Sequence, residues 1–190
     1  MKRKVNEWIK KDGVDFFNSI GLREGDKILD FGCGSGYFAV TASKIVGDKG
    51  IIYAADKGRK SLKKVDKLAR EMDAKNIRTI DTRGSIEVYL RDNSLDFVLL
   101  YDVLHQIDNR KDLYSECKRV LKSDGVLSIH PTHYNPGFVR KILNRGIDKD
   151  LDGIIEEVME SGFDIEGKIK GNIIHYKSIE KSTILNFKVK

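Results

Sequence analysis

The 190-residue chain is poor in cysteine and proline and has no long apolar run. Its two cysteines, Cys33 and Cys117, lie far apart, which favours reduced thiols over a disulfide framework. No apolar stretch approaches the roughly 20 residues that a membrane-spanning helix needs. The basic start, Met1 to Lys4, is not followed by the apolar segment of a signal peptide. We therefore expect a cytoplasmic protein that does not associate with membranes.

Acidic residues are fewer than basic ones, 29 against 35, which gives a net charge of +6 and a pI of about 9.1. A positive surplus assists binding to nucleic acid or anionic surfaces. However, the lysines between Lys57 and Lys67 have the spacing of a solvated helical face, and no single tract holds most of the charge. The length and the 40% of hydrophobic residues predict one domain with a sizeable core.

Apolar periodicity and turn residues predict alternating strands and helices. Strands are expected at 27–31, 51–55, 77–81, 95–101, 126–130, 163–169 and 182–189. Helices are expected at 5–20 (one or two), 37–46, 61–72, 113–121 and 151–161. This alternation predicts an α/β fold, with a doubly wound, Rossmann-like, mostly parallel sheet of about seven strands and helices on both faces. The last two strands have no helix between them, so we expect an antiparallel edge pair.

The domain is expected to span residues 1–190 without a linker. We expect residues 1–20 to form a helical cap at its N-terminus. Residues 131–150 contain both prolines and are expected to form an irregular loop on the substrate side. These two segments are the ones expected to cover a substrate.

The first predicted strand leads into an acidic residue and three glycines at alternate positions, namely Asp30, Gly32, Gly34 and Gly36. Glycine allows unusual backbone angles and a close approach of a ligand to the main chain. Such a turn between a strand and a helix is where α/β proteins hold nucleotide-like ligands. Asp56 follows the last glycine by 20 residues, at the end of the next strand, where a carboxylate faces a ribose. The two features predict an adenosine-type ligand.

Two cofactor classes fit this pattern. Gly34 to Ala39 matches the dinucleotide fingerprint Gly-x-Gly-x-x-Gly/Ala. However, the carboxylate of Asp30 would repel a pyrophosphate, whereas it attracts the ammonium group of a sulfonium with an amino-acid tail, directly or through water. The residues therefore favour S-adenosylmethionine over NAD.

Five blocks along the chain carry a family resemblance. They are Ile28 to Gly36, Asp56, Asp92 to Val98, Val103 to His105, and Arg119 to Gly125. In this order they resemble the motifs of class I S-adenosylmethionine-dependent methyltransferases, near the small methyltransferases related to the ubiquinone/menaquinone C-methyltransferases. The likeness covers roughly residues 20 to 130, the whole nucleotide-binding core.

The resemblance implies roles for individual residues. It assigns the methionine end of the cofactor to Asp30, Gly32, Gly34 and Gly36. It implies that Asp56 holds the ribose and that Lys57 flanks the adenine. The adenine edge falls near Gly84 and Ser85, where the family often has a Gly-Asp pair. Tyr101, at the end of the fourth strand, falls near the transferable methyl group.

Candidate catalytic residues follow the fourth and fifth strands. Methyl transfer from a sulfonium depends mainly on positioning, and it needs a base only if the acceptor must lose a proton. His105 is the leading base candidate, with a packing or capping role as the alternative. Asp102 either orients a base or a cationic amine, or caps a short helix. His133, near His130, is a candidate for the substrate pocket.

We expect no metal site, because no cysteine or carboxylate lies near enough to complete a site with His130 and His133. Cys33, within the glycine turn, is expected to be a small packing residue. His175 is expected to be structural or exposed to solvent.

Three functions remain open from the sequence. The first is methyl transfer to a small molecule. The second is methyl transfer to RNA or protein through the basic surface, although Tyr101 to Leu104 stand where amino-directed nucleic-acid methyltransferases commonly have Asn-Pro-Pro-Tyr. The third is a non-catalytic module that binds the cofactor. The sequence leaves the oligomeric state open.

Overall fold

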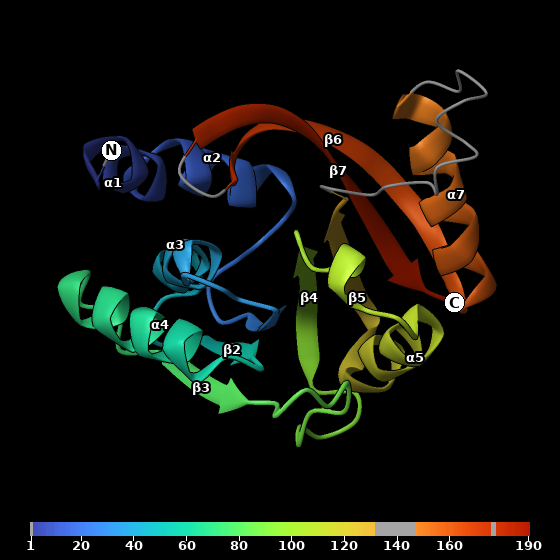
Figure 1. The fold of residues 1–190 in the computed structure, drawn as a ribbon, viewed down its shortest axis with the longest axis horizontal. Coiled ribbons are helices and arrows are strands. Elements are labelled where there is room, and N and C mark those ends of the chain that lie inside the picture. Colours follow the sequence, from blue (N-terminus) through green and yellow to red (C-terminus); the bar gives the residue numbers. More distant parts are fainter. Residues whose placement is uncertain (1, 132–146, 176–177) are drawn as a thin grey trace.

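Strands and helices mostly alternate from β1 to β5, although β4 follows β3 without a helix, and two long strands follow α7 (Figure 1). The computed structural model describes residues 2–131, 147–175 and 178–190. The helical elements are α1 (Lys2–Lys10), α2 (Asp12–Ser19), α3 (Tyr37–Val46), α4 (Arg59–Glu71), η1 (Leu104–Gln106), α5 (Arg110–Val120) and α7 (Ile147–Glu160). The strands are β1 (Lys27–Phe31), β2 (Ile51–Asp56), β3 (Ile77–Asp81), β4 (Leu95–Tyr101), β5 (Leu121–His130), β6 (Phe163–His175) and β7 (Ser178–Val189).

All seven strands form one sheet in the order β3-β2-β1-β4-β5-β7-β6. The first five are parallel, and β7 is antiparallel to both β5 and β6. This confirms the predicted mostly parallel sheet and its antiparallel C-terminal pair. Because the parallel strands end at one edge, the residues that follow β1, β2, β3 and β4 come together there.

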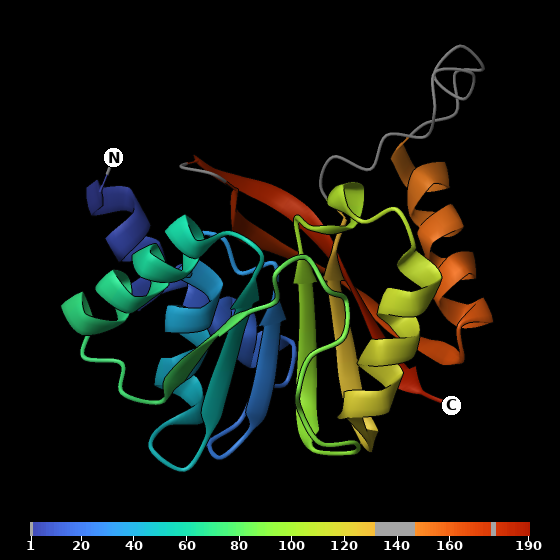
Figure 2. The ribbon, with the colours of Figure 1, turned by 60° about the horizontal axis from the view of Figure 1, so that its bottom comes forward.

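Helices cover both faces of this sheet, as predicted (Figures 1 and 2). Successive side chains of a strand point to opposite faces. Ile28 of β1 packs in the core cluster that includes residues of α1 to α4, whereas the next residue, Leu29, packs in the cluster that includes residues of α5 and α7. The strand β4 is buried on both faces, which accounts for its continuous apolar run. Within the described residues, no helix is long and apolar enough to cross a membrane.

The hairpin of β6 and β7 is longer than the sequence predicted. Its strands run through 163–175 and 178–189, where the sequence predicted 163–169 and 182–189. The stretch around Gly171 lies beyond the predicted end of β6. Contacts with the N-terminal helices continue the strand through it: Trp8 Nε1 donates a hydrogen bond of 2.7 Å to the carbonyl of Asn172. A Cβ at Gly171 would lie 3.0 Å from the ring of Phe16, so glycine permits this close approach. In Figure 1 the hairpin arches from the sheet edge to α2.

The loop predicted at 131–150 ends earlier than expected, because α7 begins at Ile147. Residues 132–146 lie outside the described residues. At the other end of the chain, two helices, α1 and α2, form where one or two were predicted. They pack beside α3 and contact β6.

Candidate functional site

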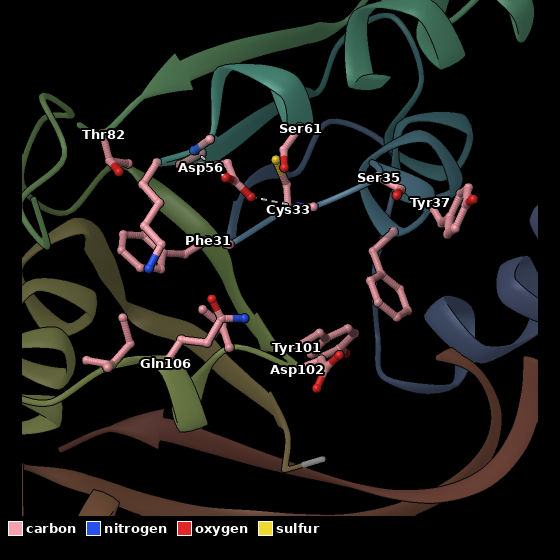
Figure 3. A pocket seen from close by; sticks show the side chains of 18 of the residues that line it. Phe31, Cys33, Ser35, Tyr37, Asp56, Ser61, Thr82, Tyr101, Asp102 and Gln106 are labelled. Atoms are coloured by element: carbon pink, nitrogen blue, oxygen red, sulfur yellow. Dashed lines mark hydrogen bonds between the residues drawn. The ribbon is translucent and has the colours of Figure 1, made fainter. Parts of the chain in front are cut away.

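A cavity of about 450 Å³ opens at the carboxyl ends of the parallel strands (Figure 3). Its walls come from the glycine turn after β1, the end of β2, the loop after β3 and the segment after β4. Ile174 and His175, at the end of β6, also line it. In Figure 3 Asp56 lies on one side of the cavity, and Tyr101 and Asp102 lie on the other.

The turn after β1 brings the main chain to the cavity wall. The backbone N–H groups of Gly32 and Cys33 both donate to the carbonyl of Ala55, at 2.8 and 3.0 Å. Gly32 has φ +79°, and a Cβ there would lie 2.5 Å from Cγ2 of Val103. Only glycine fits this position without displacing its neighbours. At Gly34 a Cβ would have no atom closer than 3.9 Å, so this glycine leaves open space at the wall.

Asp56 joins the glycine turn to the next helix. Its Oδ2 accepts a hydrogen bond of 3.0 Å from the backbone N–H of Gly34, and its Oδ1 accepts one of 2.6 Å from Gly58. These bonds fix the plane of the carboxylate. Each carboxylate oxygen has a further lone pair that can accept a hydrogen bond. The arrangement therefore presents two acceptors that suit a pair of neighbouring hydroxyl groups.

Asp30 is a buried carboxyl in β1, and only 1% of its surface is exposed. It does not itself line the cavity, although the next residues, Phe31 and Gly32, do. Among the described residues, its Oδ2 has no hydrogen-bond partner. Burial raises its pKa to about 7; the backbone N–H of Ala39 opposes this rise, and the charge of Asp56 adds to it. A buried acceptor without a donor fits a cationic or N–H-bearing ligand group.

Tyr101 forms part of the opposite wall within a group of aromatic rings. Its ring stacks on Phe17 at 6.3 Å between centroids and meets Phe38 edge-on at 4.9 Å. The Tyr101 hydroxyl shares a hydrogen bond of 2.8 Å with Ser128 Oγ. Burial raises the pKa of Tyr101, so its hydroxyl remains protonated at neutral pH. The aromatic part of this wall is thus apolar, and the Tyr101 hydroxyl in it is paired.

Asp102 carries the polar groups of the same wall. Its Oδ1 lies 3.8 Å from Nδ1 of His105, and its Oδ2 lies 3.3 Å from Nε2 of His175. Nδ1 of His175 lies 2.9 Å from Oε1 of Glu180. His175 was expected to be either structural or exposed to solvent, and exposure is excluded: only 12% of its side-chain surface is accessible, and it lines the cavity. The residue that follows β4 and residues of η1, β6 and β7 thus meet at one place.

The loop after β3 forms the remaining wall. Gly84 and Ser85 line the cavity there, as does Lys57 from the end of β2. Arg119 of α5 stabilises the loop between β3 and β4, because its guanidinium donates hydrogen bonds of 2.9 Å to the carbonyls of Val88 and Leu90.

The structure brings together most of the residues singled out in the sequence. Those that line the cavity are Gly32, Gly34, Asp56, Lys57, Gly84, Ser85, Tyr101 and Asp102. Gly36 instead precedes α3, where a Cβ would lie 2.9 Å from Val65, and His105 is next to the lining residue Gln106. His133 lies outside the described residues. Burial raises the pKa of the Cys33 thiol, which agrees with a packing role.

Sequence reasoning missed several lining residues, namely Ser61, Thr82, Ile86, Gln106, Ile107, Ile174 and His175. The sequence signal for the last two was the alternation of Ile or Gly with charged or polar residues, which continues past Ile169 to Ile173. Within the residues that the structure describes, no group of three or more His, Cys, Asp or Glu side chains could hold a metal ion.

Comparison with known proteins gives a consistent result. A family described as "Methyltransferase domain" matches residues 29–129. A demethylmenaquinone methyltransferase of Lactobacillus johnsonii is 29% identical over 127 residues, which are 67% of this chain and 50% of that protein. A protein-L-isoaspartate O-methyltransferase of Methanococcus aeolicus is 26% identical over 110 residues, 58% of this chain and 48% of that protein. The chain thus spans about half the length of the curated relatives it matches.

Among solved structures, a SAM-dependent methyltransferase from Aquifex aeolicus has the same fold over its whole length. The TM-score is 0.77 at 18% identity, with 100% of this chain and 99% of that chain covered. At this identity the likeness concerns the fold.

Proposed function

This chain belongs to the family of S-adenosylmethionine-dependent methyltransferases, and from that premise we propose that it transfers a methyl group to a small-molecule acceptor. The observation that carries the proposal is the carboxylate of Asp56, fixed by two backbone N–H groups beside an open glycine turn. The named relatives methylate different kinds of acceptor, so the acceptor class has to be argued from the cavity itself.

The residues present fit the cofactor. In the proposed arrangement Asp56 accepts hydrogen bonds from the ribose hydroxyls, and Lys57, Gly84 and Ser85 border the adenine. The open space at Gly34 allows the ligand to approach the main chain. Asp30 is the acceptor for the ammonium group of the methionine end, directly or through water.

When bound, S-adenosylmethionine supplies a methyl group on a positively charged sulfur. The wall of Tyr101 and Asp102 would face the reacting end. The aromatic side of this wall excludes water, and the carboxylate of Asp102 orients an acceptor or receives its proton, with His105 beside it. These catalytic roles, and a role for His133 in the substrate pocket, are part of the proposal.

The shape of the cavity supports a small acceptor. Its volume of about 450 Å³ lies within the roughly 300–1,000 Å³ typical of small-molecule sites. Ile174 and His175 of the β6–β7 hairpin line the side where Asp102 lies, so a polymer would have to insert a single group past the hairpin to reach it. The demethylmenaquinone methyltransferase relatives are named for a quinone acceptor, which is neither RNA nor protein.

The cofactor site is tested by the substitution Asp56→Asn. It removes a charged acceptor of two hydrogen bonds, so the Kd for S-adenosylhomocysteine should rise about 10- to 100-fold in titration calorimetry. The matched control is Asp81→Asn, because Asp81 pairs with Asp56 in the parallel register but does not line the cavity. Equal affinity in wild type and Asp56→Asn would show that the assignment of Asp56 is wrong.

The acceptor class needs a separate experiment. The protein is incubated with S-adenosylmethionine carrying a labelled methyl group, together with a cell extract separated into RNA, protein and small molecules. We expect label in the small-molecule fraction. Label in RNA or protein would support the alternative acceptors, and cofactor binding with no transfer to any fraction would support a non-catalytic module.

A further inference from the structure

The β6–β7 hairpin crosses the acceptor side of the cavity and meets Asp102 there. Its two strands are joined next to His175, which the register pairs with Ser178. The hairpin is anchored farther back, where Trp8 donates to the carbonyl of Asn172. Beyond that anchor, Ile174 and His175 reach the cavity and form part of its wall. The contact between His175 and Asp102 therefore joins the end of the hairpin to the end of β4.

The imidazole of His175 lies between two carboxylates from different strands. Nε2 is 3.3 Å from Oδ2 of Asp102, and Nδ1 is 2.9 Å from Oε1 of Glu180. On its other side, Asp102 faces His105 of η1 at 3.8 Å. Within residues 2–131, 147–175 and 178–190, these ion pairs bring together the residue that follows β4 and residues of η1, β6 and β7. Only 12% of the His175 side chain and 23% of that of Asp102 are accessible, so water screens their attraction incompletely.

The protonation state of the imidazole decides how well it fits between two carboxylates. A protonated imidazole has two N–H groups and can donate to both carboxylates at once. A neutral imidazole has one N–H, and the lone pair of its other nitrogen then faces a negatively charged oxygen. Imidazoles exchange this proton in the range of about pH 5 to 8.

We propose that Asp102, His175 and Glu180 form a proton-dependent clasp that holds the β6–β7 hairpin over the cavity. In it, His175 is a positioning residue: it fixes the carboxylate of Asp102 at the acceptor side and closes the wall around bound ligand. The clasp is complete when His175 is protonated and weakens as the pH rises. The part that concerns ligand binding rests on the proposed cofactor site, whereas the closure of the hairpin does not.

The closure is tested first without ligand. Hydrogen–deuterium exchange of the hairpin amides is measured at about pH 5.5 and 8.5 in an Asp30→Asn background, which removes the pH dependence that Asp30 gives to stability, and is corrected for the intrinsic pH dependence of exchange. With His175 unchanged, amides near the end of the hairpin should be protected roughly tenfold more at the lower pH. His175→Gln and Glu180→Gln should lose this difference, since neither variant can form both ion pairs. The control Lys181→Gln, which changes the exposed charge next to Glu180, should retain it.

Ligand binding is then measured with 5′-methylthioadenosine. This probe has no amino-acid tail, so the titration of Asp30 does not enter the comparison. Its Kd in the wild type should rise roughly tenfold from about pH 5.5 to 8.5, and His175→Gln should show the weaker value at both. Equal hairpin protection at both pH values, or a pH difference that survives in His175→Gln, would overturn the clasp. Failure of the probe to bind at either pH, with the exchange result intact, would count against the cofactor site and leave the clasp supported.

Discussion

A carboxyl group enclosed within the sheet gives Asp30 an unusual influence on stability. In the unfolded chain an aspartate has a pKa near 3.8, whereas burial raises the pKa of Asp30 to about 7. The folded state therefore keeps the proton over a pH range in which the unfolded chain releases it. It follows that the free energy of unfolding falls as the pH rises from about 4 to 7, by about 4 kcal/mol at most.

The substitution Asp30→Asn should remove this pH dependence. Asparagine has the same shape and no charge to bury, so the variant should be more stable than the wild type at about pH 8 and similar to it near pH 4. Urea unfolding at a series of pH values measures the difference. Asp48→Asn, in an exposed turn, is the control and should follow the wild type. If Asp30→Asn is no more stable than the wild type at about pH 8, ionisation of the buried Asp30 does not lower the free energy of unfolding at that pH.

Single residues of the glycine turn were predictable because their constraints are local. Gly32 needs a positive φ, and Asp56 follows at a spacing set by one helix and one strand. The position of His175 was not predictable in this way, because it depends on contacts with Asp102, 73 residues earlier in the chain. Nothing in the sequence near His175 indicates that partner.

At the scale of elements, the contrast lies between the parallel core and the last hairpin. The strands β1, β3 and β4 have the predicted bounds, because each is a short segment with apolar residues that loop or turn residues bound. The β6–β7 hairpin extends past the predicted ends because the N-terminal helices cover one side of it. Tertiary packing, rather than local preference, sets its length.

The substitution Trp8→Phe should loosen that hairpin. It removes the N–H that pairs with the carbonyl of Asn172 and leaves space around a fully buried ring, at a cost of about 2–4 kcal/mol. Urea unfolding should give the loss in stability, and hydrogen exchange should place the largest loss of protection in β6. Arg3→Gln, on the exposed side of the same helix, should cost less than about 0.5 kcal/mol. Unchanged protection in β6 would mean that Trp8 does not anchor the hairpin.

At the scale of the whole molecule, the net charge of +6 predicts behaviour toward nucleic acid. A basic protein binds RNA through phosphate contacts that weaken steeply with salt. We expect weak binding of a single-stranded RNA at about 50 mM salt, lost by about 200 mM, in fluorescence anisotropy. Because we propose a small acceptor, the same RNA should receive no labelled methyl group. Methyl transfer to RNA, or binding that persists at the higher salt, would contradict this prediction.

The fold as a whole was the most predictable level. The alternation of strands and helices predicted a mostly parallel sheet, and the closely spaced final strands predicted the antiparallel pair. What remained beyond reach was which segment covers the cavity. The sequence pointed to residues 1–20 and 131–150, of which 132–146 lie outside the described part of the chain, and it did not point to Ile174 and His175 of the hairpin, which line the cavity. A hairpin at the sheet edge can project in several directions, and only its packing partners select one.

The position of β7 between β5 and β6 has a consequence for the order of assembly during translation. Among the strands of this sheet, Ser178–Val189 is the last to leave the ribosome, so β5 has one unpaired edge until nearly all of the described chain has emerged. Such an edge is an aggregation hazard for a nascent chain. The wall formed by Ile174 and His175 is also completed only at that stage. Ribosome-bound chains that end before Ser178 should therefore contain the glycine turn but lack a closed cavity.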